Sequence, residues 1–147
     1  MKQILRLALF MAGMATAALA WSAPLTLEDV ASLKTVTSVR LSPDGERIAD
    51  ILQVQREVYV EEDGRPYREL HVVDLAGNST AYVTGKVNVD TIAWAPDGRS
   101  IYFVSKRDAE ATFNSIWQIP LAGGEARQVF THVSSIGAIH PSPDGST

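Results

Sequence analysis

Two neighbouring carboxylates form the pattern in this sequence that is best suited to binding chemistry. Glu61 and Glu62 are followed by Asp63 and Gly64, and a pair of adjacent anions facing a cavity suits an ammonium group. The same four residues are also typical of a hydrophilic turn, with Gly64 as the turn glycine. Glu61 and Glu62 are therefore the predicted substrate-binding residues, with a simple turn as the alternative.

No residue of the sequence is predicted to be catalytic. The serine nucleophile of an α/β-hydrolase lies in a Gly-x-Ser-x-Gly turn, and this pattern does not occur in the 147 residues. Ser79 follows Gly77 and Asn78, in a connector between two predicted strands where a serine is a turn residue. We therefore expect the chain alone to be inactive as a hydrolase.

Metal and cofactor sites are not predicted either. The histidines are His71, His132 and His140, and no two of them have the short spacing of a metal site on one strand or helix. The aspartates of the recurring turns described below would need a denser carboxylate loop to bind Ca²⁺. The sequence thus predicts no metal and no other cofactor.

An internal repeat defines the elements that position these residues. One signature, Ser/Ala-Pro-Asp-Gly, occurs at 42–45, 95–98 and 142–145. The second and third copies are 47 residues apart (145 − 98), and the first and second are 53 apart (98 − 45). The extra residues are placed in the segment 57–67, because a hairpin tip absorbs an insertion at little entropic cost. Proline, aspartate and glycine in this order favour a tight turn between two strands.

Runs of β-forming residues flank these turns. Eight strands are predicted, at 37–41, 48–54, 70–75, 80–84, 90–94, 101–105, 115–119 and 127–131. The runs 70–73 and 101–104 are almost continuously apolar, which indicates strands covered on both faces. The predicted fold class is all-β: a partial β-propeller of about two and a half four-stranded antiparallel blades. An eight-stranded sandwich is the alternative.

The first twenty residues have the layout of a cleavable secretory signal peptide. Lys2 and Arg6 precede 14 uncharged, largely apolar residues at 7–20, and small residues stand before a predicted cleavage after Ala20. A membrane anchor is the alternative, but a spanning helix needs about 20 residues. We expect export to a bacterial periplasm or to the medium, with no membrane association after cleavage.

Composition restricts the partners. The net charge is −4 for the whole chain and −6 (−4 − 2) without Lys2 and Arg6, so a surface that binds nucleic acid is not expected. The chain has no cysteine, so its hydrophobic core and backbone hydrogen bonds must hold it together. Composition predicts no oligomeric state.

The predicted organisation has three segments. They are a signal peptide (1–20), an N-terminal segment with a short helix (21–36) and an incomplete propeller (37–147), with blades at about 37–84 and 90–131 and a third beginning at about 135. In the short helix, Thr26 can form a capping box with Asp29. The third turn is followed by only two residues, and we expect the chain to be a truncated piece of a longer protein.

With these residues in view, the chain resembles the start of an exported serine peptidase of the prolyl oligopeptidase family, of the acylaminoacyl-peptidase or dipeptidyl-peptidase kind. The matching stretches are 24–30, 36–45, 70–75, 92–98 and 136–139. The resemblance implies a propeller that filters access by size, and an α/β-hydrolase domain with a Ser, Asp and His triad that acts on peptides. We expect that second domain to lie outside these 147 residues. The resemblance also likens Glu61 and Glu62 to the carboxylate pair by which dipeptidyl-peptidase propellers hold a free amino terminus.

A non-catalytic periplasmic propeller that binds protein partners is the alternative function. Blades with the Ser-Pro-Asp-Gly signature also occur in the periplasmic propeller of the Tol system. A signal peptide followed directly by a short acidic helix favours the peptidase family. Sequence downstream in the gene would separate the two, because a nucleophile elbow indicates the enzyme and further blades followed by a stop indicate the binding module.

Overall fold

The computed structural model describes residues 24–107 and 111–144, so the predicted signal peptide lies outside the described residues. Within them, the elements are α2 (Leu27–Ala31), β1 (Thr35–Leu41), β2 (Arg47–Val54), β3 (Tyr67–Asp74), β4 (Ser79–Val83), β5 (Val89–Trp94), β6 (Ser100–Ser105), β7 (Ser115–Pro120) and β8 (Arg127–Thr131). No helix in these two ranges is long and apolar enough to cross a membrane.

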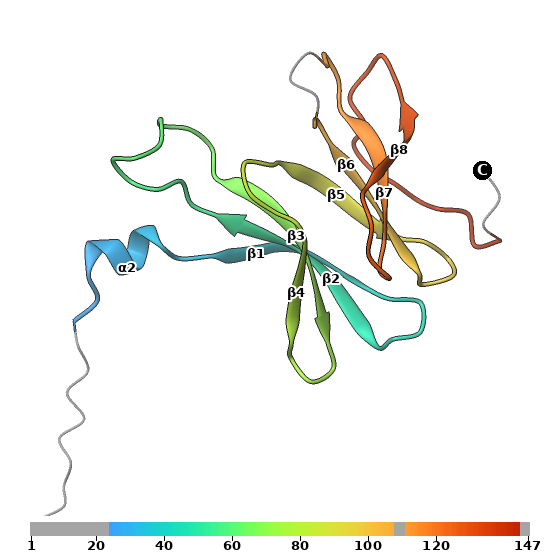
Figure 1. The fold of residues 1–147 in the computed structure, drawn as a ribbon, viewed down its shortest axis with the longest axis horizontal. Helices are drawn as coiled ribbons and strands as arrows, with labels where there is room; N and C mark the ends of the chain where they lie inside the picture. The colour runs from blue at the N-terminus through green and yellow to red at the C-terminus, as the bar shows by residue number, and fades with distance from the viewer. Residues whose placement is uncertain (1–23, 108–110, 145–147) are drawn as a thin grey trace, which may run out of the picture.

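The strands form two four-stranded antiparallel sheets, β1-β2-β3-β4 and β5-β6-β7-β8 (Figure 1). Each sheet contains four consecutive strands of the chain, which is the strand order of a propeller blade. The predicted all-β fold class is confirmed: the two sheets follow one another in a partial, propeller-like arrangement, and neither sheet closes into a barrel.

The recurring signature forms the turn between the first two strands of each sheet. The backbone N–H of Gly45 donates to the carbonyl of Ser42, and that of Gly98 donates to the carbonyl of Ala95, both at 2.9 Å. The φ angles of Gly45 and Gly98 are 75° and 65°, in the left-handed region that glycine adopts without a Cβ clash. The signature therefore recurs because this turn requires it.

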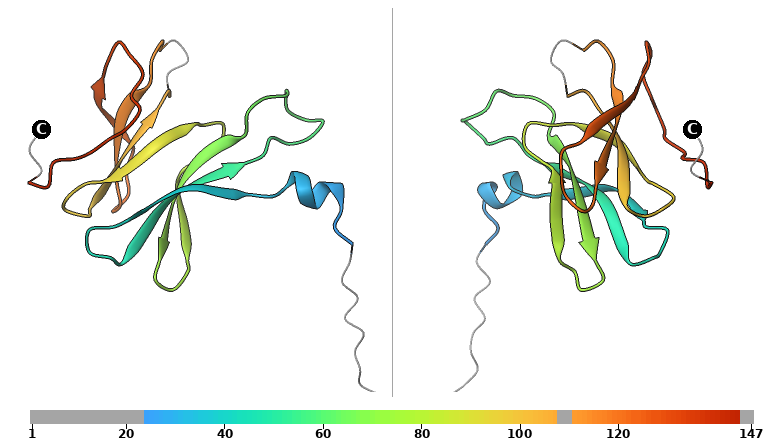
Figure 2. Two further views of the ribbon diagram at one scale, coloured as in Figure 1. Left: turned by 180° about the vertical axis from the view of Figure 1, so that it is seen from behind. Right: turned by 45° about the vertical axis from the view of Figure 1, so that its right-hand side comes forward.

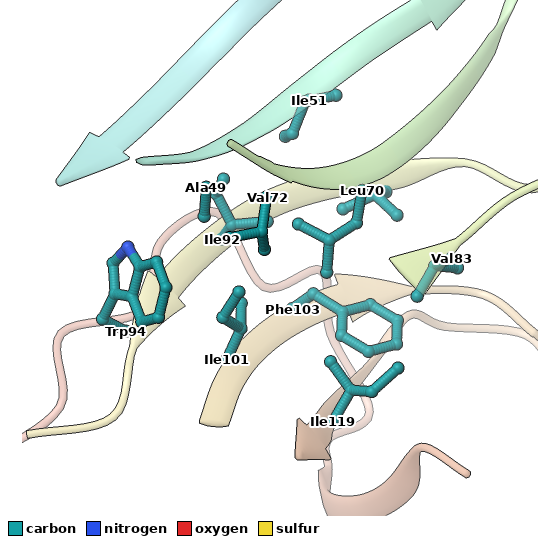
Figure 3. Close-up of a cluster of buried hydrophobic side chains, with 11 residues drawn as sticks. Ala49, Ile51, Leu70, Val72, Val83, Ile92, Trp94, Ile101, Phe103 and Ile119 are labelled. Carbon is teal, nitrogen blue, oxygen red and sulfur yellow. The ribbon is translucent and has the colours of Figure 1, made fainter. Parts of the chain in front are cut away.

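The hydrophobic core lies between the two sheets (Figure 3). Its buried members are Ala49, Ile51, Leu70, Val72, Val83, Val89, Ile92, Trp94, Ile101, Phe103 and Ile119. Val104, whose side chain points to the opposite side of β6 from Phe103, is also fully buried. The apolar run 101–104 is thus covered on both faces, as its sequence predicts.

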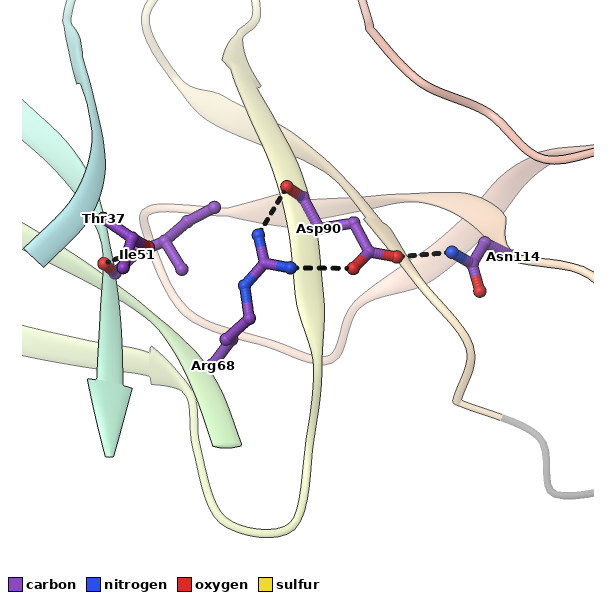
Figure 4. Close-up of polar contacts among 5 residues, drawn as sticks. All are labelled: Thr37, Ile51, Arg68, Asp90 and Asn114. Carbon is purple, nitrogen blue, oxygen red and sulfur yellow. Dashed lines mark hydrogen bonds and ion pairs between the residues drawn. The ribbon is translucent and has the colours of Figure 1, made fainter. Parts of the chain in front are cut away.

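Polar contacts join the two sheets near the ends of β5. The indole N–H of Trp94 donates to the carbonyl of Arg40 at 2.8 Å. At the other end, the guanidinium of Arg68 lies 3.0 Å from the carboxylate of Asp90 and donates to its carbonyl at 2.8 Å (Figure 4). The side-chain amide of Asn114 donates to the same carboxylate. β5 is therefore fixed to the first sheet at both ends.

The segment 132–144, where the sequence predicts the start of a third blade, contains no strand. It runs alongside the second sheet (Figure 1), and residues 139–142 line a groove with Tyr102 and Ile116 on the far face of that sheet. The hydroxyl of Ser142 donates to Asp144 at 2.6 Å, as that of Ser42 donates to Asp44 at 2.5 Å. A β-strand needs a hydrogen-bonded neighbour, and among the described residues this segment pairs with none.

Candidate functional site

A shallow groove beside the helix contains the predicted binding residues. The loop 55–66 joins β2 to β3 and lies on the same side of the first sheet as α2 (Figure 2). Glu61 and Glu62 both line the groove, together with Val30 and Ala31 of the helix. A capping box holds the start of this helix, because Thr26 and Asp29 each accept a backbone hydrogen bond from the other. The structure thus brings the predicted pair to one surface.

The carboxylate of Glu61 is already matched by a cation. Its Oε1 lies 2.8 Å from Nζ of Lys86 and accepts a hydrogen bond from the hydroxyl of Tyr67 at 3.1 Å. Its Oε2 accepts one from the backbone N–H of Glu57 at 3.1 Å. The hydrogen bond from Lys86 is the main reason that the pKa of Glu61 is lowered from 4.5 to about 2. Any incoming ammonium group would have to compete with Lys86.

Arg56 holds the loop that carries Glu62. Its guanidinium donates to the carbonyls of Arg65 and Glu62 at 3.0 Å and 3.1 Å, and it stacks 4.8 Å from the ring centroid of Tyr67. A Cβ at Gly64 would lie 2.7 Å from Cζ of Arg56, so a larger residue there would displace the guanidinium. The backbone of Glu62 is therefore fixed while its side chain is exposed.

The prediction that Glu61 and Glu62 bind substrate stays a prediction, and the geometry separates their roles. Glu61 forms an ion pair with Lys86, which lies outside the loop, and Glu62 is the exposed carboxylate in the groove. Sequence inspection missed Lys86 because it is 25 residues (86 − 61) away from Glu61. The pairing of β3 with β4 brings the two together, and no local pattern marks such a pair.

We expect the Glu61→Gln variant to lose part of the acid sensitivity of the fold. Because the folded-state pKa of Glu61 is depressed to about 2, its carboxylate stabilises the fold above about pH 4.5, and this contribution is lost as pH falls toward 2. Urea unfolding of wild type and variant between pH 2 and 7 measures the effect. The variant should be less stable at pH 7 and show a shallower decline below pH 4.5. Glu62→Gln is the matched control and should follow the wild type.

A second polar cluster lies on the face of the first sheet that points away from the second sheet. Nδ1 of His71 is 3.3 Å from the hydroxyl of Ser79, and Nε2 is 3.1 Å from a carboxylate oxygen of Glu69. Asp50, paired with His71 across β2 and β3, is 5% exposed and its Oδ1 has no hydrogen-bond partner. Burial raises the pKa of Asp50, and the nearby His71 opposes this in part.

Serine, histidine and glutamate side chains follow one another in this cluster, as serine, histidine and an acidic residue do in the catalytic triad of a serine hydrolase. The backbone at Ser79, however, does not support catalysis. Ser79 is the first residue of a regular strand, whereas a nucleophile elbow presents its serine on a sharp strand-to-helix turn. The structure therefore assigns no catalytic role to Ser79.

The remaining histidines make separate local contacts. Nδ1 of His132 is 2.9 Å from the hydroxyl of Ser134, and its ring stacks on Phe130, while His140 lines the groove beside the second sheet. In the part of the chain that the structure describes, no three His, Cys, Asp or Glu side chains are grouped to hold a metal ion.

Two curated proteins are similar in sequence to this chain, and no protein-family profile matches it. Dipeptidyl-peptidase 5 of Porphyromonas gingivalis is 40% identical over 95 residues, which are 63% of this chain and 13% of that protein. The uncharacterized peptidase YuxL of Bacillus subtilis is 28% identical over 123 residues, which are 84% of this chain and 18% of that protein. The chain is related to peptidases. It spans less than a fifth of either relative.

Proposed function

We propose that this chain is the N-terminal propeller region of an exported serine peptidase of the prolyl oligopeptidase family. The observation that carries the proposal is the 40% identity to a dipeptidyl-peptidase over 95 residues, in a chain built from two successive four-stranded sheets. In this proposal the propeller filters peptide substrates by size. An α/β-hydrolase domain elsewhere in the longer polypeptide supplies the serine nucleophile.

The sequence supports catalysis by a domain other than the propeller. The 147 residues contain no Gly-x-Ser-x-Gly elbow, so the chain offers no serine activated in the manner of this enzyme class. The substrate class is peptides, held through the hydrolase domain, and no cofactor is required by this chemistry. Export follows from the proposed signal peptide at 1–20.

Peptidase assays on two purified proteins test the proposal. We expect the 147-residue chain to hydrolyse no peptide amide or model ester, and the product of the complete gene to hydrolyse both. A serine-directed reagent should abolish the activity of the longer protein. If the longer protein contained only further blades and remained inactive on peptides, the protein would instead be a non-catalytic propeller.

We further propose that Glu62 contacts the free amino terminus of the substrate in that longer enzyme. Its carboxylate is exposed in the groove, whereas that of Glu61 is bound to Lys86. Glu62→Gln should raise KM for peptides with a free amino terminus several-fold, because one charge-assisted hydrogen bond is weakened. The same variant should leave KM for amino-blocked peptides unchanged, and equal effects on both substrates would contradict this role.

A further inference from the structure

A pocket of about 310 Å³ lies where β6 of the second sheet ends. This volume is within the usual range of small-molecule sites. Ser105, the last residue of β6, and Trp117 of β7 line the pocket, together with Lys106 and Arg107, which follow β6 directly. The groove that contains Glu62 is lined by other residues, so the pocket is a separate feature of the chain.

The pocket is on the face of the second sheet that packs against the first sheet. Trp117 pairs with Phe103 across β7 and β6, and Phe103 is buried in the core between the sheets. Ser105 is two residues after Phe103, so its side chain is on the same face of β6. A following blade would cover the opposite face, to which Val104 and Ile116 belong. The pocket therefore lies away from the surface that further blades would cover.

The pocket is basic, although the chain as a whole is acidic. The net charge of the chain is −4, yet the charged side chains described in the lining are those of Lys106 and Arg107, with His132 beside them. Within the described ranges, no ion pair joins either cation to a carboxylate. The guanidinium of Arg107 lies 5.0 Å from the ring centroid of Trp117, and this stacking orients it. The pocket thus presents two positive charges, one of them held in place by an aromatic ring.

Hydroxyl groups add hydrogen-bond donors to the same lining. Ser105 is 1% exposed, and its Oγ has no hydrogen-bond partner among the described residues, which is uncommon for a buried polar group. The hydroxyl of Ser115 donates to Oγ1 of Thr131 at 3.3 Å, so the hydroxyl hydrogen of Thr131 can be donated elsewhere. Cations and hydroxyl donors together suit an anion that has more than one oxygen.

We infer that this pocket binds the carboxylate of a peptide. The ligand class rests on the proposed function, in which peptides are the substrates. The flat face of the Arg107 guanidinium is against Trp117, which leaves its N–H groups to form two parallel hydrogen bonds with a carboxylate. Lys106 supplies a second charge, and Phe113, which also lines the pocket, supplies apolar surface for a neighbouring side chain. A carboxyl terminus and an acidic side chain offer the same chemistry.

This pocket and the groove at Glu62 open at the same end of the sheets. The carboxylate of Asp90 contacts both Arg68, at the start of β3, and Asn114, just before β7 (Figure 4). The loop that carries Glu62 leads into β3, and the connection that carries Arg107 leads into β7. A peptide with an ammonium group at one end and a carboxylate at the other therefore meets opposite charges on the two sheets.

Titration calorimetry on the product of the complete gene tests the inference, because it measures binding rather than turnover. The ligands are N-acetyl-phenylalanine, with a terminal carboxylate, N-acetyl-aspartate α-amide, with a side-chain carboxylate, and the uncharged N-acetyl-phenylalanine amide. We expect a carboxylate ligand to bind at least tenfold more tightly than the amide, because the amide cannot form the charged pair. The tighter of the two carboxylates identifies which source the pocket accepts.

Substitutions locate the binding. Arg107→Gln should weaken binding of the carboxylate ligand about tenfold, and Lys106→Gln should weaken it less, because lysine offers a point charge rather than a fork. Both residues are exposed, so the fold should persist, which circular dichroism checks. Arg99→Gln is the matched control, because Arg99 is an exposed arginine in the turn between β5 and β6, and this variant should bind as the wild type does.

Three results would overturn the inference. Equal affinity for the carboxylates and the amide, or for the wild type and Arg107→Gln, excludes a carboxylate site in this pocket. Inorganic sulfate that binds as tightly as the peptide acids would indicate a general anion site instead. The connection after β6 also contains Asp108 and Glu110. If replacing both by their amides tightened binding tenfold or more, the native ligand would be a carboxylate of the connection itself.

Kinetics of the complete protein relate the pocket to the proposed peptidase. Arg107→Gln should raise KM several-fold for a peptide with the carboxylate that calorimetry identifies, and not for the matching peptide amide. If the complete protein hydrolysed no peptide, the proposed function would fall, while calorimetry would still decide whether the pocket binds a carboxylate. If it hydrolysed peptides but bound acid and amide equally, only the carboxylate pocket would be excluded.

Discussion

Phe103→Ala is expected to lower the free energy of unfolding by about 3–5 kcal/mol. The side chain of Phe103 is fully buried at the centre of the cluster between the sheets (Figure 3). Removing the ring loses its transfer free energy and leaves a cavity whose walls are strands that cannot collapse freely. Single domains are stable by about 5–15 kcal/mol in total, so this one change should remove a large fraction of the stability.

Urea unfolding followed by circular dichroism measures this loss. Phe113→Ala is the matched control, because Phe113 is 38% exposed in the connection between β6 and β7, and it should cost less than about 1 kcal/mol. If Phe103→Ala does not fold, Phe103→Leu keeps most of the volume and should cost about 1.5 kcal/mol or less. Equal costs for Phe103→Ala and Phe113→Ala would show that the core is not centred on β6.

The strand pattern could be predicted from the sequence because it depends on local signals. Pro-Asp-Gly turns and apolar runs place each of the eight strands within a few residues of its position in the structure. The start of β3 could not be found in this way. Its prediction begins at 70, but β3 begins at Tyr67, which pairs with Val54, and the backbone N–H of Arg68 donates to the carbonyl of Val87 at 3.0 Å. Strand ends are decided by such distant partners rather than by local propensity.

The polar chemistry of the surface was predictable only in part. The carboxylates of the loop are visible in the sequence, but the ion pair of Glu61 with Lys86 exists only once β3 and β4 pair. Asp50 looks like a strand residue of ordinary polarity, and only the structure shows that it is buried with an unpartnered oxygen. Arg68 and Asp90 are 22 residues (90 − 68) apart in sequence and meet only because the two sheets pack together.

The two tryptophans on strands illustrate the same limit. Sequence predicts that both Trp94 and Trp117 pack between blades. Both contact the core, but the indole N–H of Trp94 crosses to the first sheet, at Arg40, whereas that of Trp117 donates to Ser105 within its own sheet at 3.1 Å. The guanidinium of Arg107 stacks on the Trp117 ring at 5.0 Å. Of these two tryptophans, Trp94 is therefore the one whose indole N–H links the two sheets.

Trp94→Ala should therefore weaken the contact between the sheets as well as the stability of the chain. Trp94 is 8% exposed, and truncating a buried tryptophan costs about 3–5 kcal/mol. Trp94→Phe keeps most of the apolar contact and removes the hydrogen bond to Arg40, so it should cost about 1 kcal/mol from that bond, plus a smaller packing loss. Urea unfolding of both variants separates the two contributions.

Amide hydrogen exchange identifies the strands that Trp94→Ala destabilises. In Trp94→Ala, protection should fall in β1 and β5, because the contact that joins them is gone, and it should fall less at the pairing of β6 with β7. Trp117→Ala is the matched control, and its effect should be concentrated within the second sheet, where the Trp117 hydrogen bond lies. If both alanine variants lowered protection in β1 equally, Trp94 would have no special part in joining the sheets. If the loss of protection were confined to β1 and β5, the contact between these two strands would be the first to open when the two sheets separate.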